Sequence, residues 1–418
     1  MRPGVPRNVT SQAASSGPGT PGSSLPALAE VGGAFLRLGL VSFGGPVAHL
    51  GYFRKEFVER RRWLDDADYA EVVALCQFLP GPASSQVAFA LGMRRAGLAG
   101  ALLASLCFML PSAAAMILFA YGVASLGDVS HAGWLHGLKL AAVAVVAQAV
   151  WGMGTRLCPD WPRRILGAAA AAAVLLLPGA PSQIGAIAAC AFAGWLCYRG
   201  GATRQESHAG GLTRRHLWAA ASLLLFGLLL VGLPVLARIS GDRDVAVFDG
   251  FYRAGSLVFG GGHVVLPLLR SEVVPRGWIS DGAFLAGYGA AQAVPGPLFT
   301  FAAYLGTVIF RSGPHAWAGG ILALFAIYLP AWLVVGGAYP FWHAIRAKSR
   351  AQGALNGADA AVVGILLAAL YRPVCAESIG NAGDAAAAAA AIVLLARFRV
   401  PPWAVVALMA AAGQWVLR

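Results

Sequence analysis

Apolar stretches separated by short polar connections fill almost the whole chain after residue 26. Several are long enough to cross the hydrocarbon core of a bilayer, which takes about 20 residues. Four of the longest contain almost no charged residue: Leu98–Val123, Leu135–Met153, Leu217–Ala237 and Ala316–Tyr339. The full set of apolar segments covers residues 31–53, 68–91, 98–124, 134–154, 164–178, 183–199, 216–238, 246–269, 283–310, 316–340, 354–373, 384–396 and 401–417. This pattern predicts an all-α polytopic membrane protein with about 10 to 13 crossings, in which some pairs of short segments form re-entrant hairpins.

Two copies of one sequence pattern interrupt these apolar segments at matching places. The first copy contains Ser42-Phe43-Gly44-Gly45-Pro46 and then Gln77-Phe78-Leu79-Pro80-Gly81-Pro82. The second copy contains Val258-Phe259-Gly260-Gly261-Gly262 and then Gln292-Ala293-Val294-Pro295-Gly296-Pro297. The spacing is 216 residues at the glycine breaks and 215 residues at the Pro-Gly-Pro breaks, so one single-residue gap aligns the copies. Paired interruptions of this kind in two halves are typical of transporters, whose substrate sites lie at the interrupted helices.

The number of basic residues differs between the two copies. The connections after the first glycine break and after the first Pro-Gly-Pro segment hold seven, and the matching connections of the second copy hold three. They are Arg54, Lys55, Arg60, Arg61, Arg62, Arg94 and Arg95 in the first copy and Arg270, Arg276 and Arg311 in the second. Because basic loops favour the cytoplasmic side of a membrane, matching loops are expected on opposite sides. The halves are therefore predicted to be inverted-topology repeats with broken helices.

The chemistry of the breaks favours a small anion. A helix cannot continue through both prolines of a Pro-Gly-Pro segment, and the half-helix that restarts after it presents free N–H groups and a positive dipole end. Glycine pairs allow the backbone conformations of an anion-binding nest. Gln77 and Gln292 add amide donors at matching positions, and no acidic residue lies inside either break. The predicted substrate-binding set is Gly44, Gly45, Pro46, Gln77, Pro80, Gly81, Pro82, Gly260, Gly261, Gly262, His263, Gln292, Pro295, Gly296 and Pro297.

Several charged or titratable residues near the breaks are candidates for anion attraction or ion coupling. They are Arg37, His49, Arg253, Lys139 and Asp359. Charges inside membrane segments are functional candidates, and Lys139 and Asp359 lie at nearly equivalent places in the two halves. Each candidate also has a structural alternative. The arginines can anchor helices at the membrane surface, the histidines can bond backbone carbonyls, Lys139 and Asp359 can serve polar packing, and the breaks can serve close packing or kinks.

Composition excludes a soluble protein. The chain is 58% apolar and 12% charged, with a mean hydropathy of +0.68. Its net charge of +13 is spread over short connections between apolar segments, which sets topology and does not indicate nucleic-acid binding. Six scattered cysteines show no spacing suited to zinc, and no metal or cofactor is expected.

The domain organisation follows from the repeat. Residues 1–26 are rich in Ser, Gly and Pro and are predicted to form a disordered tail. The first repeat is assigned to residues 27–200, a polar linker to 201–215 and the second repeat to 216–418.

The quoted motifs resemble the chromate transporter family (ChrA, or CHR) in its long-chain, two-domain form. Phe43-Gly44-Gly45-Pro46, His49 and the first Pro-Gly-Pro segment are similar to the first-half signature of the family. Phe259-Gly260-Gly261-Gly262-His263 and the second Pro-Gly-Pro segment are similar to the second-half signature. The resemblance implies a multi-pass protein of the bacterial inner membrane that exports chromate, a sulfate-like dianion, as a secondary transporter and confers chromate resistance.

Other functions are left open by the residues themselves. A carrier or channel for another tetrahedral oxyanion, such as sulfate or molybdate, would use the same donors. An enzyme is disfavoured because the chain has no nucleotide, metal or nucleophile motif and no clustered carboxylates. The expected partners are the oxyanion and the lipid bilayer, a homodimer stays open, and the coupling ion and the orientation in the membrane are not determined.

Overall fold

The computed structural model describes residues 24–125, 133–177, 180–197, 214–259, 262–341 and 349–415. Almost all of these residues are helical, and no strand occurs among them. Five of the helices described are long and apolar enough to cross a membrane: Ala83–Val123, Gly133–Leu157, His216–Ser240, Ala316–Phe341 and Gln352–Ser378. Each contains one of the long apolar segments of the sequence, which confirms a polytopic helical membrane protein.

The first half begins with two helical hairpins. Its elements are α1 (Leu25–Val41), α2 (Gly45–Phe53), the π-helical η1 (Arg54–Arg60), α3 (Asp66–Phe78) and α4 (Ala83–Ser125). In the first hairpin α1 packs antiparallel to α2 and η1, so that the ring of Phe35 contacts those of Phe53 and Phe57. In the second hairpin α3 packs against the start of α4, and Arg94 forms an ion pair with Asp68. The tips of the two hairpins are the predicted breaks.

Helix α4 combines a hairpin arm with a long span. The backbone leaves the helical range at Ala96 and Gly97, where φ is −143° and 63°. Residues 83–95 therefore form the hairpin arm, and residues 98–125 form a separate span, in which Phe108 contacts the His49 ring near the tip of the first hairpin.

The second half repeats this arrangement. Its elements are α9 (Arg243–Ser256), η2 (Gly262–Val264), α10 (Val265–Val273), α11 (Asp281–Ala293), η3 (Leu298–Thr300), α12 (Phe301–Ile309), α13 (Ala316–Ala338) and η4 (Tyr339–Phe341). Arg253 of α9 pairs with Glu272 of α10 across the first hairpin, at 3.2 Å. The Tyr304 hydroxyl of α12 donates to the Ala283 carbonyl of α11 across the second, at 3.1 Å.

Further helices surround the hairpins. The first half continues with α5 (Gly133–Leu157), α6 (Trp161–Leu176) and α7 (Ala180–Cys197). The second half continues with α15 (Ser349–Ala369), η5 (Leu370–Cys375), α16 (Ala376–Ser378), α17 (Ala382–Ala396) and α18 (Pro402–Trp415). Between the halves, α8 (Arg214–Ser240) packs on α9 and α13 with most of its apolar surface exposed, as expected for a helix that faces lipid.

The two halves are inverted with respect to each other. We call the cluster of Glu30, Arg61, Asp68, Arg94 and Arg95 the first-half base, and the cluster of Asp242, Arg243, Arg276 and Ser280 the second-half base. The hairpins of each half open at its own base. The long part of α4 leaves the first-half base and runs antiparallel to α13, since Ser105 bonds Trp332 while Tyr121 accepts a hydrogen bond from the Trp317 N–H.

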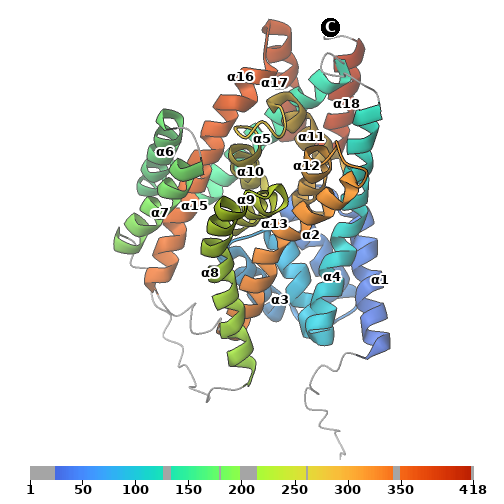
Figure 1. Cartoon of the computed structure of the whole chain (residues 1–418), viewed down its shortest axis with the longest axis vertical. Helices are drawn as coiled ribbons and strands as arrows, with labels where there is room; N and C mark the ends of the chain where they lie inside the picture. Colours follow the sequence, from blue (N-terminus) through green and yellow to red (C-terminus); the bar gives the residue numbers. More distant parts are fainter. Residues whose placement is uncertain are drawn as a thin grey trace, which may run out of the picture.

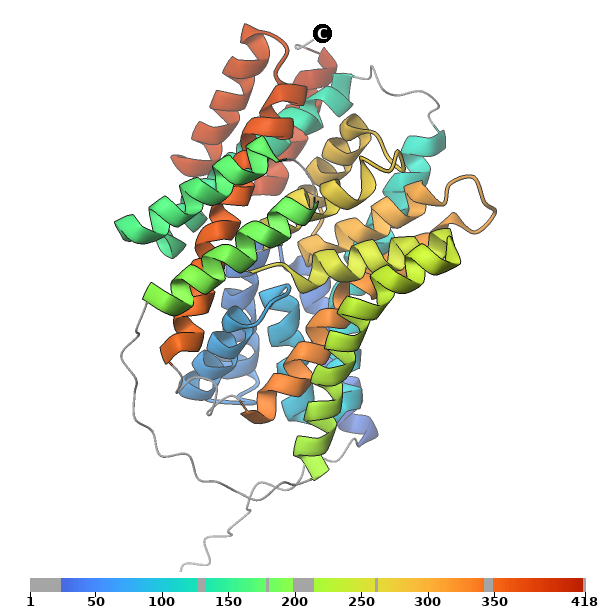
Figure 2. The same cartoon turned by 60° about the vertical axis from the view of Figure 1, so that its left-hand side comes forward.

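The views agree with this arrangement, because α1 and α3 lie low in the molecule whereas α10, α11 and α12 lie above them (Figures 1 and 2). The predicted inverted repeats with broken helices are confirmed.

The predicted tail and linker fall almost wholly outside the described residues. Helix α1 already begins at Leu25 and α8 at Arg214, which is slightly earlier than the predicted boundaries after residues 26 and 215.

Candidate functional site

The breaks of the two halves meet at the hairpin tips. The N–H of Gly81 donates a hydrogen bond of 2.7 Å to the carbonyl of Val258, and the N–H of Gly296 donates one of 2.8 Å to the carbonyl of Ser42. Gly296 is the repeat equivalent of Gly81, and Val258 is that of Ser42. Each Pro-Gly-Pro tip therefore binds the glycine break of the opposite half, and this reciprocal pair of hydrogen bonds joins the two halves at their tips.

Glycine is required at the tips by conformation and by space. Gly44, Gly45, Gly81 and Gly296 have φ values of 100°, 77°, 123° and 104°, in the region that residues with a Cβ rarely adopt. A Cβ on Gly81 would lie 2.7 Å from the amide nitrogen of Gln86, and one on Gly296 would lie 2.8 Å from the hydroxyl of Ser112. Gly260 and Gly261 lie outside the described residues, and Gly262 starts η2.

The prolines lie where helices stop and restart. Pro46 is in the first turn of α2, Pro82 immediately precedes α4, and Pro297 is the residue before η3. Pro80 and Pro295 lie just after the ends of α3 and α11. Helices thus begin at the tips of both halves with free N–H groups, as the sequence predicts.

Polar atoms at the tips lack protein partners. The hydroxyl of Ser42, the side-chain oxygen of Gln86 and the amide nitrogen of Gln292 are buried, and none bonds another group among the described residues. An unsatisfied buried polar group costs about 1–3 kcal/mol, so such groups gather where water or a polar ligand enters.

A pocket of about 280 Å³ opens beside the tips of the first half. Its lining residues are Pro46, Leu50, Cys76, Gln77, Leu79, Gly81, Ala83, Arg156, Leu157 and Asp359. A second pocket of about 360 Å³ adjoins it, because Gln77 and Asp359 line both. The first pocket brings the predicted Pro46, Gln77 and Gly81 together with Asp359 of the other half. Arg156 was not predicted, although a lone basic residue at the end of an apolar stretch was a usable signal.

The second half does not present its equivalent residues in the same way. Gln77 is exposed, whereas Gln292 is only partly exposed and its amide nitrogen is enclosed. A pocket of about 540 Å³ between the halves is lined by Gln183 of the first half and by Pro267, Arg270, Arg372 and other residues of the second, but not by Gln292 or Gly296. The two halves are therefore related in sequence and topology but differ in which tip residues they expose.

The histidines bond protein groups. The buried His49 ring donates through Nε2 to the Ser42 carbonyl, at 3.1 Å, and so shares this acceptor with Gly296. Nδ1 of His263 is 2.7 Å from the hydroxyl of Tyr288. Neither histidine lines the 280 Å³ pocket.

The predicted arginine pair is not equivalent in space. Arg253 is held by Asp249 at 2.6 Å and by Glu272 at 3.2 Å. Arg37 is exposed on α1 and forms no ion pair with any described residue.

Lys139 and Asp359 are not brought together either. Lys139, on α5, lies against Gly282 at the start of α11. Asp359, on α15, lines the pockets beside Gln77.

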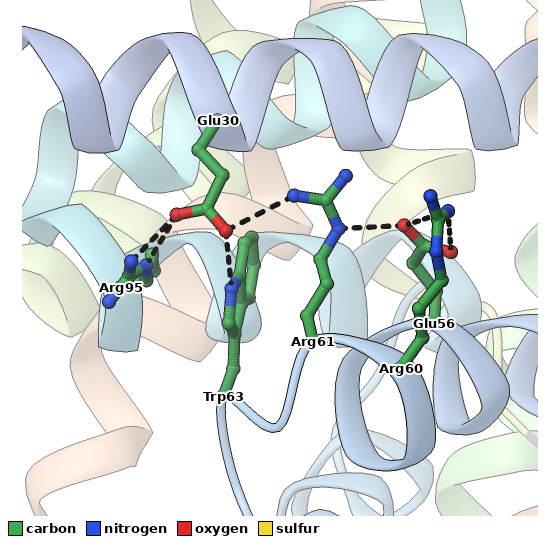
Figure 3. A network of polar contacts seen from close by, with 6 residues as sticks. All are labelled: Glu30, Glu56, Arg60, Arg61, Trp63 and Arg95. Atoms are coloured by element: carbon green, nitrogen blue, oxygen red, sulfur yellow. Dashed lines mark hydrogen bonds and ion pairs between the residues drawn. The ribbon is translucent and has the colours of Figure 1, made fainter.

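A network of charged residues lies at the base of the first half (Figure 3). Glu30 accepts from Arg95 at 2.6 Å, Arg61 at 3.1 Å and the Trp63 indole at 3.0 Å. Glu56 pairs with Arg60 and Arg61, and the second half repeats the i,i+4 pair with Glu272 and Arg276. Burial raises the pKa of Glu56, but hydrogen bonds from Arg61 and Arg60 outweigh burial and hold the pKa below its usual value. These basic residues are already bound to carboxylates.

The described residues contain no cluster of three or more His, Cys, Asp or Glu side chains that could hold a metal ion. The cysteines are free, and most of them are buried or half-buried.

Comparisons with known proteins agree with the repeat. The chromate transporter family model matches residues 29–195 and again residues 245–414. A chromate transport protein of Pseudomonas aeruginosa is 30% identical over 343 residues, which cover 79% of this chain and 77% of that protein. A chromate transport protein of Cupriavidus metallidurans is 25% identical over 371 residues, covering 87% of each chain.

A probable chromate transport protein of Synechococcus elongatus is 26% identical over 360 residues, covering 80% of this chain and 82% of the other. No solved structure gives a significant match. Two matches of one family model that together span most of the chain, one in each inverted half, show that this protein belongs to the chromate transporter family.

Proposed function

We propose that this protein is a secondary transporter that carries chromate across the membrane by alternating access. The observation that carries the proposal is the reciprocal junction of the hairpin tips, with a donor-lined pocket on one side of it. Irregular backbone at membrane depth persists only where it is buried in protein or lines a cavity, and half-helix N-termini are suited to anions. The relatives named as chromate transport proteins supply the choice of anion.

The substrate is proposed to bind where the first-half pocket reaches the tips. The Gln77 amide, the N–H groups at the starts of α2 and α4 and the Arg156 guanidinium supply donors there. When the second half takes the exposed arrangement of the first, Gln292 and its neighbours would receive the anion on the other side. Neither end requires a redox or hydrolytic group, since the chemistry is binding and release.

Export from the cytoplasm, driven by an ion gradient, and the resulting chromate resistance are part of this proposal. Sulfate and molybdate have the same tetrahedral shape and charge, and the donors at the tips do not discriminate by element. Competition between these anions therefore belongs in the test.

The test is energised chromate uptake by everted membrane vesicles that contain the protein, with and without excess sulfate. We expect energy-dependent accumulation, which Gln77→Ala and Gln292→Ala each reduce about tenfold or more because a donor to the dianion is lost. The matched control is Gln148→Ala, since Gln148 is exposed on α5 and lines neither first-half pocket.

Each contrary result has a separate meaning. No accumulation by vesicles that contain folded wild-type protein would contradict chromate export. Wild-type rates in both tip variants would contradict the site. A large conductance without saturation would indicate a channel.

A further inference from the structure

Two arginines outside the predicted breaks occupy equivalent places in the two halves. Arg156 lies in the last turn of α5. Arg372 lies 216 residues later, in η5 at the end of α15, which is the spacing that relates Arg37 to Arg253. Each arginine lines a pocket formed mostly by residues of its own half: Arg156 lines the 280 Å³ pocket and Arg372 the 540 Å³ pocket. The duplication therefore places one guanidinium beside the hairpins of each half.

Neither the Arg156 nor the Arg372 guanidinium is held by a direct hydrogen bond or salt bridge to any described residue, although Arg156 interacts electrostatically with Asp359. Arg270, which lines the second pocket together with Arg372, is by contrast engaged by Asp281 and Glu377. Asp359 shares the first pocket with Arg156 and is attracted to it electrostatically, but no direct ion pair joins the two side chains. A free guanidinium in a pocket can bind an oxyanion through two parallel hydrogen bonds.

A purely structural role for these arginines is the natural alternative. A basic side chain near a helix C-terminus interacts favourably with the helix dipole, and its stem can cover apolar surface. All three arginines are exposed, and Arg238 fits that description because it lies in the last turn of α8 and lines neither of the two pockets. Position in a pocket and repetition in the other half separate Arg156 and Arg372 from Arg238.

We propose that Arg156 is the counter-charge for the substrate anion while the first-half pocket is open, and that Arg372 takes over this role when the second half is open. The inference rests on the proposed function and deepens it by naming the cationic group on each side. Transfer of the dianion between two equivalent guanidinium groups keeps its charge compensated on both sides of the tips.

The first experiment measures equilibrium binding of radiolabelled chromate to purified protein in detergent. We expect Arg156→Gln to weaken binding about 10- to 100-fold, the range for loss of charge-assisted hydrogen bonds. Arg156→Lys should retain part of the affinity, since it keeps the charge but not the planar fork. Arg238→Gln should bind like the wild type.

The outcomes of this experiment are distinguishable. Wild-type affinity in Arg156→Gln would overturn the inference while leaving the proposed function intact. Equal loss of affinity in Arg156→Gln and Arg238→Gln would overturn it as well, because a general effect of helix-end charge would then suffice. Absence of chromate binding by the folded wild-type protein would overturn the proposed function, and the inference with it.

The second experiment tests Arg372 by transport. Arg372→Gln should bind chromate in detergent with nearly wild-type affinity, because Gln77 and Arg156 face the open pocket, yet it should transport chromate at least tenfold more slowly in vesicles. Wild-type transport by Arg372→Gln, in protein with an unchanged melting temperature, would overturn the paired assignment.

Discussion

At the scale of single residues, the geometry of the tips requires glycine, because a Cβ would not fit there. Gly81 and Gly296 lack a Cβ, so each reaches a carbonyl of the opposite half with a positive φ. The same backbone in alanine would be strained by about 1–2 kcal/mol even without a clash. The junction between the halves is therefore sensitive to the smallest possible side chain.

Replacing Gly81 or Gly296 by Ala should lower both the melting temperature in detergent and the rate of chromate transport. The added methyl group would meet Gln86 or Ser112 and push the tip away from its acceptor carbonyl. The control is Gly51→Ala in α2, where a Cβ meets nothing within 4 Å. Tip variants as stable and active as Gly51→Ala would show that the junction tolerates displacement.

Glu56→Gln should lower the melting temperature at pH 7, and the difference from the wild type should shrink in acid. The pKa of Glu56 is lower in the folded protein than its ordinary value of 4.5. Its stabilising contribution is therefore complete above about pH 4.5 and is lost as the pH falls through the folded pKa. Glu59→Gln, which removes an exposed pair with Arg54, serves as control and should change the melting temperature little at any pH. A difference between Glu56→Gln and wild type that stays constant down to pH 3 would contradict the assignment.

At the scale of elements, glycines determine how closely α15 approaches the helices beside it. A Cβ on Gly357 would collide with the carbonyl of Cys190 in α7, and one on Gly364 would collide with that of Gly167 in α6. Membrane helices lack a hydrophobic driving force for association, so small residues that permit close packing carry much of the specificity. Asp359, between these two glycines, is positioned by this packing.

Gly357→Val should separate α7 from α15 and destabilise the protein by about 1–3 kcal/mol, the usual range for overpacking. Gly185→Val in α7 is the matched control, because a Cβ there meets no atom within 4 Å. Thermal unfolding in detergent, followed by size-exclusion chromatography, distinguishes the two variants. Equal melting temperatures would show that the contact does not support the fold.

At the scale of the whole molecule, the first-half base should face the cytoplasm. It carries most of the basic residues in the matching loops, and such residues are enriched on that side. In a variant in which the exposed Cys197 is replaced by Ser, Ser312→Cys should react with an impermeant maleimide in intact cells, whereas Ala67→Cys should react only after lysis. Labelling of both from the same side would contradict inverted topology.

The sequence predicted the overall fold better than it predicted which side chains contact each other. Glycine and proline breaks depend on local backbone limits, so Gly44, Gly81 and Gly296 could be recognised without a structure. The formation of hairpins at a common base could not be recognised from the sequence, because it depends on contacts such as that between Glu30 and Arg95, 65 residues apart.

Two candidate pairs at matching positions of the sequence have different surroundings in the two halves. Arg253 is engaged by Asp249 and Glu272, and Arg37 has no counterpart of Asp249 because Gly33 stands in that place. Lys139 and Asp359 lie in equivalent helices, but Asp359 is one helical turn further along its helix than the equivalent of Lys139. The two residues therefore have different neighbours.

The unequal exposure of Gln77 and Gln292 bears on the side of the membrane to which the empty carrier is open. If the two halves were identical in sequence, exchanging their conformations would give a state of equal free energy, and the resting protein would be open to either side half of the time. Only positions that differ between the repeats can bias this choice. Asp359 opposite Val143 and Glu30 opposite Ala246 are such positions. Glu30 lines neither first-half pocket, so a substitution there should change which side of the membrane the empty carrier opens to without altering the residues proposed to bind the anion.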